Sequence, residues 1–585
     1  MNMPHKSALT CLGRFTPRPR WLRATAAAAA LAGLAGCASL PASPGDDTVT
    51  VRVVGLNDFH GNLLPLPRPV AVTVSEGDIR EVQAAGAAYL ATAIAATRAQ
   101  SPFSMVVAAG DLIGASPLAS SLFLDEPTIG VMNRVGLDFN AVGNHEFDRG
   151  WRELLRIQRG GCEQTGIRVP CAVENPYGGA DFAFLAANVL TEGGETLLPA
   201  TGIKRFDTPQ GEVAVGVIGL TLKDTPILVT PSGVDGLTFA DEAATINALV
   251  PQLEAAGADA ILVAIHQGLS TTAGYNDEGC GGISGPLLDI IQQVDPRVDV
   301  VLSGHTHNAY VCDYGQIDPS RPFLVTSAAY GGSMLTDIAL EFRGDRLVAK
   351  TAENIIVGHD GDAEAGDFPR FAPDAEVAAY VERYVDAARE AAERPVGRLS
   401  GDAVKGAGLG RLIADAQLEA TRGAGAQIAL MNSGGIRAPL APEDDGTITF
   451  GDIYAVQPFG NVLMTKSLTG TQLLEILEQQ FAGPEIELLS PSAGFSFTYD
   501  PGRAAGQRIL SATLNDQPID PAANYRVTMN SFLASGGDGF ATFAEGIEAV
   551  TGPLDLDAME AWFALQPVTP VPAEKRAVVA GSQPR

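Results

Sequence analysis

Short apolar runs alternate with longer helical stretches between residues 50 and 358, and five of these runs end at polar side chains that can bind a metal ion. The five runs are Val51 to Leu56, Met105 to Ala109, Phe139 to Val142, Ala260 to Ile265 and Val298 to Leu302. Each is rich in Val, Ile, Leu or Ala and has the length of a buried strand. Because Ala-rich stretches such as 87–99 lie between them, residues 50–358 are predicted to form an α/β domain, with further strands at 211–220, 324–327 and 335–342.

The pattern changes after residue 358. Residues 359–394 begin with an acidic, turn-rich segment and continue with apolar residues at helical spacing from Val377 to Ala388, which predicts one amphipathic connecting helix ended by Pro395. Residues 395–570 are predicted to form a second α/β domain, with helices at 409–421 and 470–480 and strands at 426–431, 462–467 and 525–529. Residues 571–585 are assigned to a tail, and the chain from Pro567 onward is expected to be loosely held.

The residues at the ends of the five runs form a mixed set of imidazole, carboxylate and amide groups. Five of the seven histidines of the chain belong to it. The full set is Asp58, His60, Asp111, Asn144, His145, His266, His305 and His307. Such a set suits a pair of hard divalent cations. Because α/β sheets carry their chemistry where strands end, we expect these groups to gather at one edge of a sheet.

Spacing suggests which residues share an ion. Asp58-x-His60 could place two ligands on one ion because alternate residues of an extended chain point the same way, and His305-x-His307 could do likewise. A single carboxylate between the two pairs, Asp111, is the natural bridge between ions about 3.5–4 Å apart. In Gly143 to Asp148, an imidazole that can move charge is followed three residues later by a carboxylate that can orient it.

The overall charge limits the possible partners. The chain has 585 residues and a formal net charge of −29 at pH 7. That balance argues against binding a nucleic-acid polymer, which needs a basic face to neutralise phosphates. An acidic chain that binds a small anionic substrate needs metal ions or local arginines at its site.

The N-terminus has the features of a secretion signal. A basic region from Lys6 to Arg23 precedes an apolar core from Thr25 to Leu34 that is too short to span a bilayer. The core ends in Leu34-Ala35-Gly36-Cys37, which resembles a bacterial lipoprotein box. The resemblance implies a signal peptide over 1–36, lipidation of Cys37, a tether over 37–49 and a lipid-anchored protein of the bacterial envelope, periplasmic or surface. The alternative is an ordinary cleaved signal with a chance cysteine.

Four cysteines remain besides Cys11 in the leader and Cys37. They are Cys162, Cys171, Cys280 and Cys312. An even number in an exported chain suggests disulfides, and four cysteines allow three connectivities. Proximity along the sequence favours Cys162–Cys171 and Cys280–Cys312. A cysteine zinc site is not expected, because the sequence has no CxxC pair.

The strand-end motifs together resemble the signature of the calcineurin-like metallophosphoesterases. Asn57 to Asn62 and Gly143 to Asp148 are more specific and resemble the secreted 5'-nucleotidase family, which includes UDP-sugar hydrolases. The resemblance implies a metallophosphoesterase β-sandwich flanked by helices, a connecting helix and an α/β substrate-binding domain. It implies two divalent cations (Zn, Mn, Mg or Co), with His145 as catalytic imidazole and Asp148 as its partner. One cation would be bound by Asp58, His60, Asp111 and His307, and the other by Asp111, Asn144, His266 and His305.

Three Gly-rich stretches of the second domain could bind a nucleotide. They are 432–437, 457–461 and 530–540. From the residues alone, Phe459 and Phe532 could either stack on a flat base or belong to the core. The resemblance implies that they are a stacking pair, that Asp538 binds ribose, and that Asn432, Arg437 and Asn461 make polar contacts. One departure is Ala403, which stands where the family usually has an arginine; only Lys405 and Arg398 are near it in sequence.

These features predict a metal-dependent enzyme that hydrolyses nucleoside 5'-monophosphates, a small-molecule substrate. Alternatives on the same scaffold are hydrolysis of UDP-sugars, NAD or 2',3'-cyclic nucleotides. The related sulfur-oxidation thiosulfohydrolases are disfavoured by the two phenylalanines. A different class is a nucleotide-binding surface lipoprotein without turnover, which complete ligand motifs and His145 argue against.

Overall fold

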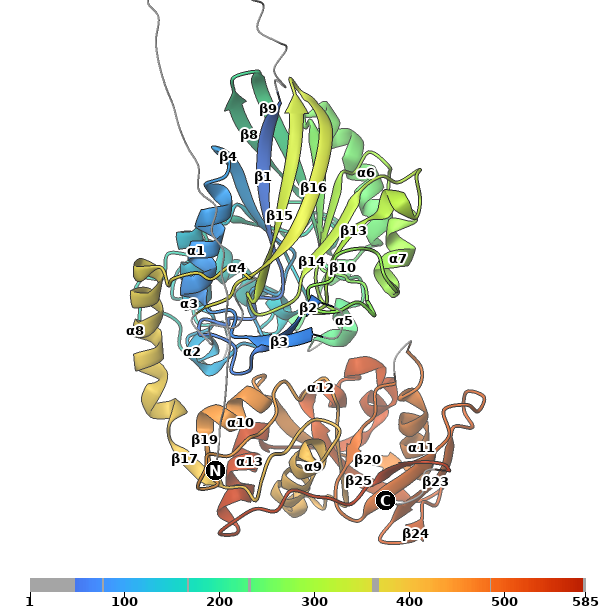
Figure 1. Ribbon diagram of the computed structural model, residues 1–585. Helices are drawn as coiled ribbons and strands as arrows, with labels where there is room; N and C mark the ends of the chain where they lie inside the picture. Colours follow the sequence, from blue (N-terminus) through green and yellow to red (C-terminus); the bar gives the residue numbers. More distant parts are fainter. Residues whose placement is uncertain are drawn as a thin grey trace, which may run out of the picture. The chain divides into compact units, whose positions relative to one another are not determined.

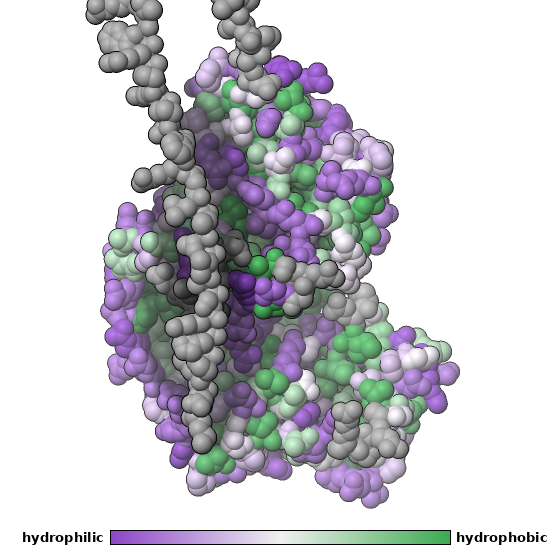
Figure 2. All heavy atoms as spheres, in the orientation of Figure 1, coloured by the Kyte–Doolittle hydropathy of each residue, from purple (hydrophilic) through white to green (hydrophobic). Residues whose placement is uncertain are grey.

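The structure is a computed structural model that describes residues 48–75, 78–165, 168–229, 233–359, 368–483 and 486–581 (Figure 1). The predicted signal peptide, Cys37 and the tether up to residue 47 lie outside the described residues. The chain from Thr48 onward forms one compact unit. Within the described residues, no helix combines the length and the apolar character that crossing a membrane requires. On the face shown in Figure 2, apolar side chains lie in separate groups among hydrophilic ones.

The N-terminal part, residues 48–359, is built on two six-stranded sheets. The first has the order β16 (Arg346–Ile356), β15 (Met334–Arg343), β1 (Val49–Leu56), β4 (Phe103–Ala108), β5 (Phe139–Ala141) and β6 (Ala183–Leu185). The second has the order β13 (Ala309–Asp313), β14 (Leu324–Ala328), β12 (Val300–Ser303), β11 (Ala260–Ile265), β9 (Gly211–Leu220) and β8 (Thr201–Thr208). Neighbouring pairs β1–β4, β4–β5, β9–β11 and β11–β12 are parallel.

The two sheets pack face to face, and the alternation of side chains along each strand explains why. Val51 and Val53 of β1 join a buried cluster with Leu262 and Ala264 of β11. The opposite face of β11 packs on helices through another cluster. Because both faces are covered, every residue of β11 is buried and its sequence is apolar throughout.

Helices cover the outer faces of this sandwich. The helices packed on the first sheet are α1 (Ala87–Arg98), α3 (Glu126–Val135) and α4 (Trp151–Arg159), and α8 (Ala375–Ala392) packs over α1 and α3. The second sheet is covered by α6 (Glu242–Ala255) and α7 (Pro286–Ile291). Shorter elements are β2 (Val70–Ser75), β3 (Asp78–Val82), α2 (Leu118–Ser121), η1 (His145–Phe147), β7 (Val189–Thr191), α5 (Thr225–Leu228), β10 (Leu237–Phe239) and η3 (Tyr314–Gln316).

Helix α8 is the predicted amphipathic helix between the two α/β regions. The Asp374 carboxylate accepts a hydrogen bond from the Val377 amide and caps its first turn. Its apolar face is buried against the N-terminal part through Val377, Tyr380, Val381, Tyr384 and Ala388. Contacts join α8 to α1, α2 and α3 on one side and to α10 (Phe450–Val456) on the other (Figure 1).

The C-terminal part, residues 394–581, has its own sheets. A five-stranded sheet has the order β21 (Ser490–Pro491), β18 (Ile428–Met431), β25 (Asn524–Asn530), β20 (Val462–Thr469) and β26 (Ile547–Leu554). A four-stranded sheet has the order β24 (Gln517–Pro518), β23 (Ile509–Leu514), β22 (Phe495–Tyr499) and β27 (Ala577–Val579). β17 (Pro395–Arg398) pairs with β19 (Thr447–Thr449). The other elements are α9 (Leu409–Ala420), η4 (Arg422–Ala424), α11 (Gly470–Gln479), α12 (Ser531–Ala534), η5 (Gly537–Gly539), η6 (Ala541–Glu545) and α13 (Asp555–Ala564).

The expectation of a loosely held tail is wrong for the described residues up to 581. Thr569 bridges to Leu399, and β27 pairs in parallel with β22. The Arg576 guanidinium donates two hydrogen bonds of 2.6 and 3.0 Å to the buried Asp415 carboxylate on α9. Periodicity could not reveal this order, because it comes from partners that are distant in sequence.

Both disulfides favoured by sequence proximity are present. Cys162–Cys171 has a Cα–Cα distance of 5.6 Å and Cys280–Cys312 one of 4.7 Å. Disulfides of this kind are typical of exported proteins.

Candidate dimetal site and adjoining pocket

The predicted ligands all follow strand ends, but those strands belong to two sheets. Asp58 and His60 follow β1, Asp111 follows β4 and Asn144 follows β5, all in the first sheet. His266 follows β11, and His305 and His307 follow β12, both in the second sheet. The expectation of a single sheet edge is therefore wrong. Face-to-face packing of two sheets brings their strand ends to a shared rim.

The local backbone also differs from the expected extended chain. The φ angles of Asp58 and His60 are both 46°, and those of His305 and His307 are 71° and 57°. These are left-handed conformations, which cost free energy for residues with a Cβ and are held by the surrounding structure. Amide hydrogen bonds from Asp58 to the Gly110 carbonyl and from His60 to the Asp111 carbonyl, 3.0 and 2.9 Å, hold the first pair.

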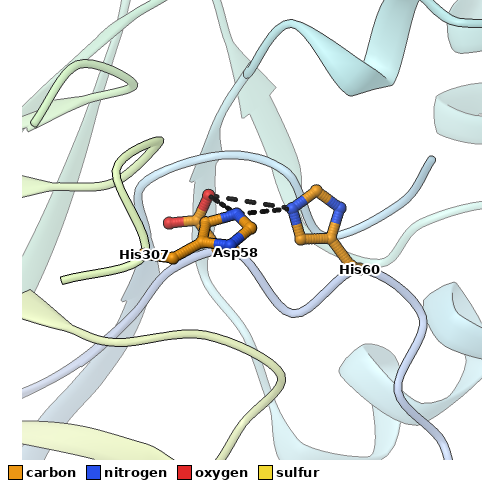
Figure 3. Close-up of side chains that lie close together, drawn as sticks. All are labelled: Asp58, His60 and His307. Atoms are coloured by element: carbon orange, nitrogen blue, oxygen red, sulfur yellow. Dashed lines mark hydrogen bonds and ion pairs between the residues drawn. The ribbon is translucent and has the colours of Figure 1, made fainter. Parts of the chain in front are cut away.

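Two groups of three side chains at the rim could each hold a metal ion. One is Asp58, His60 and His307, and the other is Asp111, His266 and His305; within each group the ligand atoms lie within 4.8 Å of one another. Figure 3 shows the first group, whose imidazoles both turn toward the Asp58 carboxylate. His305 and His307 fall into different groups, which is the division that the resemblance implies and not the shared ion that their spacing alone also allows.

Asp111 lies between the two groups. Its Oδ2 is 3.0 Å from His266 Nε2 in one group and 3.7 Å from His60 Nε2 in the other. The Asn144 amide oxygen lies 3.1 Å from the same His266 nitrogen. The structure thus brings all seven predicted ligands together and gives Asp111 the position of a bridge.

The donor set fits a pair of divalent cations. The His60 and His266 Nδ1 atoms donate to the Gly114 and Ala109 carbonyls at 2.9 and 2.8 Å, which leaves each Nε2 directed into the site. Asp58 and Asp111 are fully buried, and within the described part of the chain their only ion-pair partners are histidines. Buried carboxylates need compensating positive charge, which cations at these groups would provide.

The pKa values of the imidazoles show the same balance of burial and charge. Burial lowers the pKa of His60 and of His305 to about 3, so both are neutral and able to ligate. Burial also disfavours charge on His266, but the Asp111 carboxylate outweighs it and raises the pKa of His266 to about 10. A cation bound beside Asp111 would take the place of that proton.

Glu146 holds two loops of the rim together, and no role was predicted for it from the sequence. Its buried carboxyl oxygens accept hydrogen bonds from the amides of Gly143, Asp111 and Leu112 at 2.6, 2.9 and 2.8 Å. The loop after β5 is thereby tied to the loop after β4. A Cβ at Gly143 would lie 2.1 Å from the Asp111 carboxylate, which explains the glycine. Its place inside the Gly143–Asp148 motif was the available signal.

His145 and Asp148 form a hydrogen-bonded pair beside the ligands. The His145 Nδ1 lies 3.0 and 2.9 Å from the two Asp148 carboxylate oxygens, and the His145 amide donates to Asp111 Oδ1 at 2.9 Å. Burial lowers the pKa of His145, but the Asp148 and Asp111 carboxylates outweigh it, and the net pKa is raised. Because Nδ1 is engaged, Nε2 is the nitrogen left for a substrate.

A cavity of about 200 Å³ adjoins this pair and is lined from both parts of the chain. The N-terminal part contributes Asn144, His145, Asp148, Leu228, Val229 and His305. The C-terminal part contributes Asn432, Gly434, Gly435, Arg437, Phe459, Asn461, Asn530, Phe532 and Asp538. All six predicted substrate-binding residues therefore lie on one cavity with His145. Leu228 and Val229 were not predicted, and no sequence motif marked them. Asn530 was not assigned a role, although it is the first residue of the 530–540 stretch.

Hydrogen bonds fix the polar residues of the C-terminal wall. The Asn432 amide donates to Asp538 at 2.7 Å and accepts from Asn530 at 2.9 Å. Burial raises the pKa of Asp538 to about 6. The Phe459 ring lies nearly parallel to that of His145, with centroids 5.8 Å apart and an interplanar angle of 15°.

Ala403 stands where the family resemblance leads us to expect an arginine. Ala403 is fully buried and pairs with Leu440. Burial lowers the pKa of Lys405, and the positive charge of Arg437 lowers it further.

Comparisons with known proteins agree with this architecture. Family models match residues 51–309 (calcineurin-like phosphoesterase) and 389–545 (5'-nucleotidase, C-terminal domain). Endonuclease YhcR of Bacillus subtilis is 30% identical over 535 residues, 87% of this chain and 39% of YhcR. Protein UshA of Escherichia coli is 25% identical over 559 residues, 88% of this chain and 91% of UshA. The crystal structure of a 5'-nucleotidase precursor from Thermus thermophilus covers 91% of this chain and 100% of its own, with 25% identity and a TM-score of 0.72.

The two matched ranges correspond to the two-sheet sandwich and to the part after α8. The chain belongs to the calcineurin-like phosphoesterases that carry a 5'-nucleotidase C-terminal domain, a family of phosphoric ester hydrolases. It spans well under half the length of YhcR.

Proposed function

We propose that the protein hydrolyses nucleoside 5'-monophosphates to nucleoside and phosphate. The observation that carries the proposal is the shared cavity. It exposes His145 and His305 of the rim on one wall and Arg437, Phe459 and Asp538 on the other. A phosphate ester bound there would have its phosphoryl group at the rim and its nucleoside against the C-terminal wall.

The rim residues would hold two cations. Asp58, His60, Asp111 and His307 would bind one, and Asp111, Asn144, His266 and His305 the other; mixed nitrogen and oxygen donors suit Zn, Mn, Co or Mg. Such a pair supplies Lewis-acid chemistry, lowering the pKa of a water molecule and neutralising phosphoryl oxygens.

His145 would act on the substrate directly, and Asp148 would act through His145. The raised pKa of His145 favours the protonated ring, whose Nε2–H can donate to a phosphoryl or leaving-group oxygen. Asp148 holds the ring through Nδ1. On the other wall, the Arg437 guanidinium would pair with phosphate, Phe459 and Phe532 would stack on the base, and Asp538 would accept hydrogen bonds from ribose, with Asn432 and Asn461 as polar contacts.

The substrate is tested by a panel of AMP, UDP-glucose, NAD and 2',3'-cyclic AMP, with phosphate release measured for the metal-loaded protein. We expect the highest kcat/KM for AMP. Because Ala403 stands where the resemblance implies an arginine, the site has one cationic side chain fewer to bind a diphosphate. If another compound of the panel gave a higher kcat/KM than AMP, that compound would be the preferred substrate. Absence of hydrolysis of all four would leave a nucleotide-binding protein.

We further propose the domain division and the location of the protein. The domains are residues 50–358, the connecting segment 359–394 and residues 395–570. The two disulfides support export, and the segment before Cys37 supports a cleaved signal and a lipid anchor in the bacterial envelope. Incorporation of labelled fatty acid, lost in Cys37→Ser, checks the anchor; equal labelling of the variant would exclude it.

A further inference from the structure

Arg168 links the two parts of the chain. Its guanidinium donates to the Ser121 carbonyl at the end of α2 at 2.6 Å and to the Tyr454 hydroxyl of α10 at 3.2 Å. The central carbon of the Arg168 guanidinium, Cζ, lies 5.6 Å from the centroid of the Tyr454 ring. One planar side chain thus spans from the N-terminal part to the C-terminal part with two of its donors.

The segment that carries Arg168 is anchored at its ends. The Cys162–Cys171 disulfide closes it, and the Cys171 amide donates to the buried Glu126 carboxylate at 3.0 Å. Arg156 of α4 in turn binds Glu126 at 2.9 Å and the Gly161 carbonyl at 2.9 Å. Arg168 is therefore presented from a segment fixed to the helices of the N-terminal part.

On the far side, Tyr454 reaches the backbone beside Phe459. The Tyr454 hydroxyl, which accepts from Arg168, donates to the Pro458 carbonyl at 3.1 Å. Tyr454 is buried among apolar residues of the C-terminal part, together with Leu118 of α2. The residue after Pro458 is Phe459, whose ring faces His145 across the cavity.

The Ser121 carbonyl joins this link to the catalytic loop. Besides Arg168, it accepts a hydrogen bond from Arg149 at 3.3 Å, and Arg149 also pairs with the buried Asp125 carboxylate. Arg149 directly follows Asp148 in sequence. The Ser121 carbonyl therefore accepts hydrogen bonds from two arginines. Arg149 is adjacent in sequence to Asp148, the partner of His145, and Arg168 is linked through Tyr454 to the backbone beside Phe459.

We infer that Arg168 is a positioning residue that, through Tyr454, sets the position of the Phe459 loop over the rim and so the affinity for the base of a nucleotide. This inference rests on the proposed function. It assigns Arg168 no contact with substrate; its effect passes through the Tyr454 hydroxyl and the Pro458 carbonyl.

The test compares AMP with 4-nitrophenyl phosphate, a small ester without nucleoside, in Arg168→Ala, Arg168→Lys, Tyr454→Phe and the Arg168→Ala/Tyr454→Phe double variant. We expect Arg168→Ala and Tyr454→Phe each to raise KM for AMP about fivefold with kcat nearly unchanged, because each loses the same hydrogen-bonded link. Arg168→Lys keeps the positive charge but loses the planar guanidinium that donates to both acceptors, so its KM for AMP should lie between those of the wild type and Arg168→Ala. The double variant should be no worse than the single ones. For 4-nitrophenyl phosphate, kcat/KM should stay within about twofold of wild type.

Arg159→Ala removes an exposed arginine at the end of α4 and is the matched control, expected to leave both substrates unaffected. Thermal unfolding of each variant checks that it folds. Three results overturn the inference: an unchanged KM for AMP, equal losses for both substrates, or additive effects in the double variant. If the wild-type protein cleaves 4-nitrophenyl phosphate but no nucleotide, the proposed function fails first. If it cleaves AMP and the variants match it, only the role of Arg168 fails.

Discussion

The two walls of the cavity are built differently. Most of the rim ligands are buried, with Asp58 and His266 both 0% exposed, and backbone hydrogen bonds hold several of them. On the C-terminal wall, Phe459 and Asn461 lie on a loop and Phe532 lies in the four-residue helix α12; all three are only partly buried, and Arg437 is exposed. A rigid rim can fix reacting atoms closely, whereas loop residues can adapt to the substrate. Changes at the rim should therefore alter the rate, and changes on the loops should alter affinity.

The largest effect is expected for His145→Ala. This change removes the proton donor but no predicted metal ligand, so kcat for AMP should fall about 10²–10⁴-fold while the metal content stays at the wild-type level. Steady-state kinetics and elemental analysis of the same preparation measure both. A fall of less than tenfold, or loss of metal together with activity, would contradict the separation of His145 from the ligands.

A smaller and different effect is expected for Phe459→Ala on the opposite wall. Loss of one stacked ring should raise KM for AMP about tenfold and leave kcat nearly unchanged. Hydrolysis of 4-nitrophenyl phosphate should change little, since that substrate has no nucleoside. An equal loss of kcat/KM for both esters would remove the base-stacking role and, with it, the contrast between the two walls.

The smallest effect concerns pH and Asp538. Burial, with a smaller contribution from Glu487, raises the pKa of this carboxyl to about 6 against the opposing effects of Asn432, Lys405 and Arg437. Above that pKa the group is a carboxylate that accepts hydrogen bonds from ribose, and below it the group is protonated. The dissociation constant for adenosine should therefore rise about threefold to fivefold between about pH 7.5 and about pH 5.

Calorimetric titration with adenosine, which carries no phosphate, measures this dependence without titrating the ligand's own phosphate. Asp538→Asn cannot ionise and should bind adenosine with nearly the same affinity at both pH values. If the variant keeps the wild-type pH dependence, the titrating group is another residue.

Much of the architecture was available from the sequence because it depends on local pattern. The prediction of a strand at 211–220 matches β9, and the predicted helix at 87–99 matches α1 to within one residue. The set of ligands could be predicted because strand ends carry polar groups that a purely structural strand does not need. The pairing of Cys162 with Cys171 followed from nearness along the chain.

What the sequence could not provide depends on tertiary packing. Hydrogen bonds to the loop after β4 hold Asp58 and His60 in left-handed conformations, so these two residues fall in one group without the extended backbone that their spacing suggested. The division of the ligand strands between two sheets and the ordering of the tail by Asp415 need partners distant in sequence. Arg168 has no motif, and only its two acceptors in space reveal it.

If the rim holds two cations with Asp111 between them, the number of metal ions bound per chain should show it. The protein is stripped with a chelator, reloaded with Zn or Mn, freed of excess ion and measured by elemental analysis, with anomalous scattering locating the ions in crystals. We expect about two ions per chain in the wild type, bound at the two groups, and about one or fewer in Asp111→Asn. A rim without ions under every loading condition, or Asp111→Asn with the wild-type metal content, would exclude the proposed pair of cations.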